Sequence, residues 1–81
     1  MSFNISQRIQ DIFWYDDENR LHRQDGPAIE YADGGRAWLK HGLMHRLAGP
    51  AVVYAGGHTE WWIDNRRYDQ AEHALLAFIR V

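Results

Sequence analysis

The sequence predicts a mostly β protein of the α+β class, built as a meander of antiparallel β-hairpins and closed by a C-terminal amphipathic helix. Three observations predict this fold. A segment returns at a fixed offset, short β-prone runs alternate with turn signals, and the apolar periodicity becomes helical near the C-terminus. A fixed offset indicates one supersecondary unit that is copied along the chain.

The repeat is clearest between His22–Ala28 and His45–Ala51, which are 23 residues apart. The same offset relates the identical pairs His22/His45, Arg23/Arg46, Gly26/Gly49, Pro27/Pro50, Ala28/Ala51, Tyr31/Tyr54, Ala32/Ala55, Gly34/Gly57 and Trp38/Trp61. Aligned without gaps, unit one runs over 15–37, unit two over 38–60, and a truncated third unit starts at Trp61. We therefore expect about two and a half hairpin units.

Turns and strands alternate within each unit. The turn signals lie at 16–19, 32–35, 40–43, 55–58 and 64–66, and the β-prone runs at 13–15, 28–31, 36–39, 51–54 and 59–63. Gly and Asn in the turns adopt positive φ at low cost, as tight hairpins require. Pro27 and Pro50 lack a backbone donor and are expected at strand starts, with Gly26 and Gly49 leaving room for the kink.

The two ends of the chain do not follow the repeat. Asp69 and Glu72 form a capping-box pattern that predicts a helix from about Gln70 to Arg80. Its expected apolar stripe consists of Ala71, Ala74, Leu75, Phe78 and Ile79. In residues 1–12 the spacing of Ile5, Ile9, Ile12 and Phe13 favours a short N-terminal helix, with an extended edge segment as the alternative. The chain is then one domain, 1–81, with a cap segment (1–12), repeats (13–68) and a helix (69–81).

Composition excludes several classes of function. The net charge of −2 is too small to predict a nucleic-acid binder, and the absence of cysteine removes disulfides and thiolate metal sites. No apolar run is long enough to span a membrane, and Met1–Asn4 does not begin a secretory signal. We therefore expect a cytoplasmic protein.

Several of these motifs resemble the MORN repeat. Residues 38–45, Trp-Leu-Lys-His-Gly-Leu-Met-His, are similar to its W-x-x-N-G-x-x-H stretch, with His41 in place of Asn, and residues 31–34 resemble its Y-x-D-G turn. Residues 21–28 resemble a MORN-like variant of small bacterial and phage proteins. The resemblance covers roughly residues 13–68 and implies a hairpin array that serves mainly as a protein-contact scaffold, with lipid contacts proposed for some members.

The chain also departs from the family pattern. Arg23 and Arg46 stand where the family has glycine, and unit two has Ala48 and Gly56 where unit one has Asp25 and Asp33. With so few units, any elongated binding groove would be short.

The repeated histidines and arginines are the first candidate site residues. His22 and His45 are too few to bind Zn²⁺, and Tyr68 at the third equivalent position is a poor ligand, so we expect no metal site. Their structural alternative is a hydrogen bond to backbone at each corner. Arg23 and Arg46 either form a cationic row that meets a carboxylate or phosphate, or pair with acids of the chain itself.

Tryptophans complete the candidate site. Adjacent strand residues face opposite sides, so Trp61 and Trp62 cannot share one face, and one must be covered by the C-terminal helix or by a partner. Trp and Arg are enriched at binding hot spots. The predicted binding residues are His22, Arg23, Trp38, His45, Arg46 and Trp62.

These residues favour binding over catalysis. Serine occurs only at 2 and 6, and the acids lie mostly in turns, so we expect no enzyme and no cofactor. The predicted function is a non-enzymatic protein-binding module, with homodimerisation as a further expectation. The resemblance suggests a phage-encoded inhibitor that blocks a bacterial host system, such as a defence complex, in the cytoplasm of a bacterium or infected cell. The alternatives are a protein that sequesters a small molecule or nucleotide, and a peripheral lipid-binding module, which the near-neutral charge disfavours.

Overall fold

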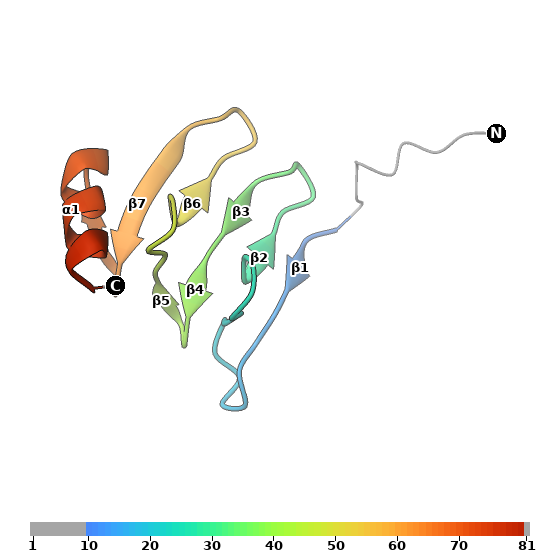
Figure 1. Ribbon diagram of the computed structural model, residues 1–81. Coiled ribbons are helices and arrows are strands. Elements are labelled where there is room, and N and C mark those ends of the chain that lie inside the picture. Colours follow the sequence, from blue (N-terminus) through green and yellow to red (C-terminus); the bar gives the residue numbers. More distant parts are fainter. Residues whose placement is uncertain (1–9, 81) are drawn as a thin grey trace.

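The computed structural model describes residues 10–80 and confirms a mostly antiparallel β fold with a C-terminal helix (Figure 1). Six strands form one sheet in the order β1-β2-β3-β6-β7-β8, and β4 pairs with β5 in a two-stranded sheet. The elements are β1 (Ile12–Phe13), β2 (Ile29–Glu30), β3 (Arg36–Ala37), β4 (Leu39–Lys40), β5 (Leu43–Met44), β6 (Val52–Val53), β7 (Thr59–Ile63), β8 (Arg66–Tyr68) and α1 (Gln70–Arg80).

The hairpin units follow one another along the sheet, so the order of the chain is the order in space (Figure 1). β1 lies at one end, and α1 packs against β7 and β8 at the other. Most of the predicted N-terminal helix falls on residues 1–9, outside the described part of the chain. Its last two apolar residues, Ile12 and Phe13, lie in β1 and pair with β2, as an edge strand does. Within residues 10–80 no helix combines the length and the apolar character needed to cross a bilayer.

Each unit has a lower turn, which lies at 17–19 in unit one, at 41–42 in unit two and at 64–65 in unit three. The lengths of these turns show that unit one aligns with unit two one residue away from the gapless alignment. Units two and three use two-residue turns in which both central residues have positive φ: 48° at His41, 83° at Gly42, 48° at Asp64 and 68° at Asn65. This is the hairpin geometry that matches strand twist. The turn of unit one is one residue longer and has positive φ at Asn19 (64°).

The longer first turn shifts the tryptophan equivalence by one residue. The backbone N–H of Trp14 donates to Ala28 O (2.9 Å), and Trp38 N–H donates to the equivalent Ala51 O (2.7 Å). Trp14 is therefore the counterpart of Trp38, whereas the alignment without gaps placed Tyr15 there. With this correction Trp14, Trp38 and Trp61 hold one position in three successive units.

The core is small because the repeated segments bring backbones close together. One cluster of buried residues consists of Ala28, Ile29, Ala37 and Leu39, against which Leu21 and Met44 pack. Ala28 and Ala51, the residues just before β2 and β6, are fully buried.

The helix has the predicted bounds and capping box but not the predicted orientation. Glu72 N–H donates to Asp69 Oδ1 (2.8 Å), and Asp69 N–H donates to Glu72 Oε1 (3.5 Å). The expected apolar stripe nevertheless faces outward: Leu75, Phe78 and Ile79 are 63%, 72% and 69% exposed, and Ala71 and Ala74 are also exposed.

The buried side of the helix presents His73 and Ala77 to the sheet. A ring contact (4.9 Å between centroids) joins His73 to Trp61, and an ion pair (2.7 Å) joins Arg80 to Asp64. The bulky Trp61 ring already fills the space under the helix, which explains why small and polar residues face inward. Of the two alternatives for covering one of the paired tryptophans, the helix or a partner, the structure shows the helix against Trp61.

The upper turns, at 32–35 in unit one and 55–58 in unit two, suggest a stabilising substitution, Gly56→Asp. In unit one Asp33 Oδ1 accepts the Gly35 N–H (2.9 Å), whereas unit two has Gly56 at the position of Asp33. A Cβ at Gly56 meets nothing within 4 Å. We expect Gly56→Asp to raise the free energy of unfolding by about 0.5–1 kcal/mol, because it restores the turn and restricts the unfolded chain. Urea unfolding measures the free energy of unfolding of both proteins, and a lower value for Gly56→Asp would contradict this account of the turn.

Candidate binding site: a cationic hollow beside Trp38

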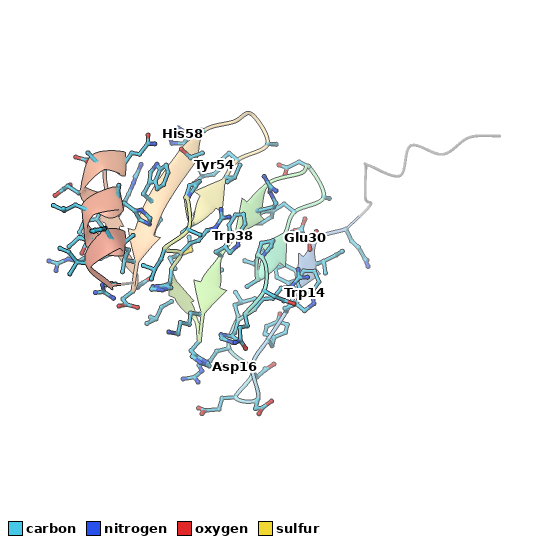
Figure 2. All side chains as sticks on the ribbon, viewed as in Figure 1. Trp14, Asp16, Glu30, Trp38, Tyr54 and His58 are labelled. Carbon is cyan, nitrogen blue, oxygen red and sulfur yellow. The ribbon has the colours of Figure 1, made fainter. Side chains whose placement is uncertain are left out.

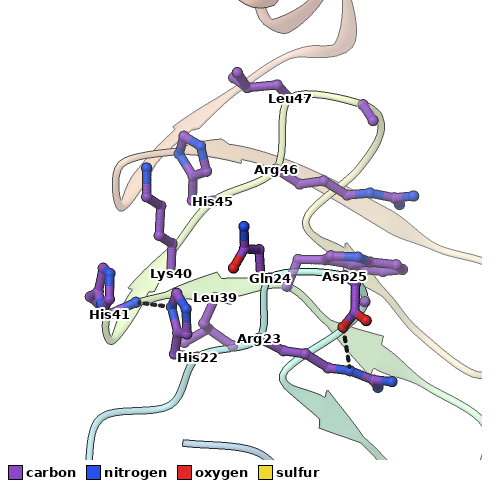
Figure 3. Close-up of a pocket in the computed structure, with 13 residues that line it drawn as sticks. His22, Arg23, Gln24, Asp25, Leu39, Lys40, His41, His45, Arg46 and Leu47 are labelled. Carbon is purple, nitrogen blue, oxygen red and sulfur yellow. Dashed lines mark hydrogen bonds and ion pairs between the residues drawn. The ribbon is translucent and has the colours of Figure 1, made fainter. Parts of the chain in front are cut away.

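An open hollow of about 950 Å³ lies where the loops of units one and two run side by side (Figure 3). Segments 22–26, 38–41 and 45–48 line it, and we call it the Trp38 hollow. Five of the six predicted binding residues line it: His22, Arg23, Trp38, His45 and Arg46. Sequence reasoning missed Lys40 and His41, which join the site because the turn after β4 folds toward the loop of unit one.

In each of the first two units an arginine stacks on a tryptophan ring. The guanidinium carbon of Arg23 is 3.9 Å from the Trp14 ring centroid, and that of Arg46 is 3.7 Å from the Trp38 ring centroid. Such cation–π contacts contribute about 0.5–1 kcal/mol at exposed sites and more where water is excluded. Trp14 and Trp38 follow one another along the sheet, so the two stacks form a row (Figure 2).

The stacks explain the repeated Gly-Pro step. Arg23 Nη1 donates to Pro27 O (3.4 Å), and Arg46 Nη1 donates to Pro50 O (3.1 Å). A Cβ on the glycine before each proline would come within 3.0 Å of the guanidinium of the same unit. Neither glycine has positive φ. The expectation that they serve backbone geometry alone was therefore incomplete, since they also make space for an arginine.

The third tryptophan is covered differently. Position 69, the counterpart of Arg23 and Arg46, is Asp69, and it caps α1 instead of stacking. His73 of α1 lies edge-on against Trp61, and its Nε2–H donates to the backbone carbonyl of Arg46. The helix thus takes the place that the arginine loop has in the earlier units.

Arg23 and Arg46 differ in their carboxylate partners. Arg23 pairs with Glu30 (3.1 Å) and Asp25 (3.4 Å), which agrees with the intramolecular alternative. The equivalent positions in unit two are Val53 and Ala48, and no carboxylate within residues 10–80 pairs with Arg46. Burial and the nearby Arg36 guanidinium lower the pKa of Arg46 from its ordinary value. Arg46 is therefore a half-buried cation without a counter-ion in the described chain.

The two repeated histidines bond to backbone at the lower turns. His41 N–H donates to His22 Nδ1 (2.9 Å), and Asp64 N–H donates to His45 Nδ1 (3.1 Å). Each imidazole therefore links one unit to the next, as the structural alternative expected, and the proton of the neutral ring resides on Nε2. In the part of the chain that the structure describes, no cluster of His, Asp or Glu could hold a metal ion.

Trp62, the sixth predicted residue, does not belong to the hollow. Its Nε1–H donates to Glu60 Oε1 (3.0 Å), and the hydroxyl of Tyr54 donates to the other oxygen of that carboxylate (2.9 Å). Glu60 and Trp62 are two residues apart in β7 and share a face, which is opposite to that of Trp61. Trp62 is half-buried, so it contributes to a different surface.

The hollow is cationic although the chain as a whole is not. Arg23, Lys40 and Arg46 line it together with one acid, Asp25, whereas the net charge of the chain is −2. Arg23 and Arg46 extend in the same direction from their loops (Figure 3). His22 and His45 already accept backbone hydrogen bonds, and Nδ1 of the third imidazole, His41, is 2.7 Å from Asp16 Oδ2. The cationic side chains make the hollow suited to holding an anionic group.

The half-buried position of His45 predicts a pH dependence of stability. Burial is the main cause that lowers the pKa of His45 below its ordinary value of 6.5. As the pH falls below 6.5, His45 of the unfolded chain binds a proton more readily than His45 of the folded chain. The contribution of the neutral His45 ring to the free energy of unfolding is therefore complete above pH 6.5 and is lost as the pH falls. In His45→Asn a side-chain oxygen can accept the same N–H without titrating. We expect the urea midpoint of the wild type to decrease between pH 7 and about 5, and that of His45→Asn to decrease less. Equal pH dependence in both proteins would contradict the assignment.

The comparisons with known proteins leave the site to be interpreted from its own geometry. No protein-family model matches the chain, and neither a curated protein nor a solved structure matches it significantly. The resemblance to MORN repeats consequently rests on the motifs themselves and stays a prediction.

Proposed function

We propose that this protein is a non-enzymatic protein-binding module whose contact surface is the Trp38 hollow. The observation that carries the proposal is the gathering of stacked Arg and Trp side chains with three histidines around one concave surface. Arginine and tryptophan are the residues that most often dominate binding energy at protein interfaces. A concave, partly apolar surface with a few fixed polar groups is also the usual form of a binding site.

The side chains of the hollow are held in place before any partner arrives. Arg46 rests on Trp38 and bonds to Pro50 O, and His45 accepts the Asp64 N–H. Ordering a flexible side chain at an interface costs about 0.5–1.5 kcal/mol, and these side chains have already lost that freedom. This preorganisation favours binding over a merely solvated surface.

For the target, we propose a host-cell protein complex that is blocked sterically, for example a bacterial defence system encountered by a phage. Two features support this proposal. The motifs resemble those of small bacterial and phage proteins, and the hollow presents arginine and tryptophan side chains of the kind found at protein interfaces. A small domain inhibits in this way by covering a surface that its target needs.

A pull-down from bacterial lysate with a matched pair of variants tests the module. Ala48 is exposed at the edge of the hollow, and Ala71 is exposed on α1 outside it. We expect the wild type and Ala71→Trp to capture the same stoichiometric partner, and Ala48→Trp, which fills the hollow, to capture at least about tenfold less. Equal capture by all three proteins would place the contact elsewhere, and no partner for the wild type would contradict the proposal.

Self-association through α1 is a second proposal, favoured by the outward apolar stripe. Leu75, Phe78 and Ile79 lie at i, i+3 and i+4, and each is more than 60% exposed. Burying one such side chain contributes about 1.5–3 kcal/mol. We expect light scattering to show a dimer for the wild type and a monomer for Phe78→Glu, with unchanged urea unfolding of the monomeric unit. Gln70→Glu adds the same charge at the start of the helix and should remain dimeric. A monomeric wild type at high concentration would refute this second proposal.

A further inference from the structure

We propose that the Trp38 hollow recognises an acidic side chain, the carboxylate of an aspartate or glutamate of its protein partner, and that Arg46 binds it. This inference rests on the proposed binding function and specifies the chemistry of the partner. It comes from comparing two copies of one unit inside the same chain, one that supplies its own carboxylates and one that does not.

Unit one shows the complete arrangement. The Arg23 guanidinium lies on the Trp14 ring, reaches Pro27 O with Nη1, and meets two acids of the same unit. Nη1 is 3.1 Å from Glu30 Oε2, and Nε is 3.4 Å from Asp25 Oδ1. The chain therefore already contains a working example of a carboxylate bound beside an arginine–tryptophan stack.

Unit two keeps the stack and lacks the acids. Arg46 lies 3.7 Å from the Trp38 ring centroid and bonds to Pro50 O, as Arg23 does in unit one. Val53 and Ala48 replace the two acids, and no other carboxylate of residues 10–80 takes their place. A guanidinium has five N–H donors, and only one of those of Arg46 has a partner in the described chain.

The surroundings of Arg46 add positive charge and free space. The Arg36 guanidinium carbon is 5.6 Å from the same Trp38 ring, and Lys40 lines the hollow. Ala48 leaves open the position that Asp25 fills in unit one, and its exposure makes that position reachable from solvent. A charged guanidinium that is half removed from water gains most from a carboxylate, because charge-assisted hydrogen bonds are about twice as strong as neutral ones.

The test uses a defined acidic peptide and a variant that gives unit two its own acid. The probe is acetylated, amidated hexaglutamate, with hexaglutamine of the same length as its neutral control. Titrations are followed by NMR through the Arg46 Nε–H and Trp38 Nε1–H resonances. Val53→Glu places a carboxylate where unit one has Glu30. Gly56→Asp adds the same negative charge in the upper turn, away from the hollow, and serves as the matched control.

We expect hexaglutamate, but not hexaglutamine, to shift both resonances in the wild type and in Gly56→Asp. Val53→Glu should bind hexaglutamate about tenfold more weakly or not at all, because its own carboxylate occupies Arg46. If Val53→Glu does not fold, Ala48→Asp, which restores the other acid at an exposed position, takes its place in the same comparison.

Two results would overturn the inference: hexaglutamate that leaves the resonances of the hollow unshifted, or equal binding by Val53→Glu and Gly56→Asp. Either result leaves the binding function intact if the wild type still captures its partner in the pull-down and Ala48→Trp does not. A lost pull-down together with hexaglutamate that still shifts Arg46 would instead refute the binding function and retain the carboxylate site.

Discussion

The stacking of an arginine on the tryptophan that begins its unit is the interaction on which the rest of the structure depends. The core contains many alanines and few large side chains, so the loops that fold back over the sheet need another means of attachment. Arg23 on Trp14 and Arg46 on Trp38 supply it, since each guanidinium covers an aromatic ring and bonds to its own loop. The repeated glycine and proline follow from this contact, because one leaves space for the guanidinium and the other presents a carbonyl to it.

The same constraint governs how the array ends. A last unit with an uncovered tryptophan would expose a large apolar surface, and terminal units of repeat arrays need a cap for this reason. Here His73 covers Trp61 and also donates to the carbonyl of Arg46. Residue 46 therefore contacts the helix through its backbone and the hollow through its side chain. Through this residue, the packing of the helix bears directly on the position of the Arg46 side chain.

The features that could be predicted from the sequence are those that depend on local chemistry. The offset between His22 and His45 gave the units, and glycines such as Gly57 with positive φ marked the turns. Asp69 and Glu72 located the start of the helix because a capping box involves only neighbouring residues. Five of the six candidate binding residues line one hollow because equivalent positions of adjacent units lie side by side in a meander.

The features that could not be predicted depend on contacts between distant segments. The extra residue in the first turn shifts Trp14 into the place assigned to Tyr15, and only cross-strand hydrogen bonds show this. The outward stripe of α1, with Phe78 exposed, follows from the size of Trp61 beneath the helix and not from helical periodicity. The effect of losing the two acids in unit two is also visible only in the structure. Nothing in the sequence marks Val53 and Ala48 as unusual, yet they leave Arg46 stacked, half-buried and without a counter-ion in residues 10–80. The scaffold thus keeps the stack that stability requires in both units, while a change of two side chains leaves a charged site available in one of them.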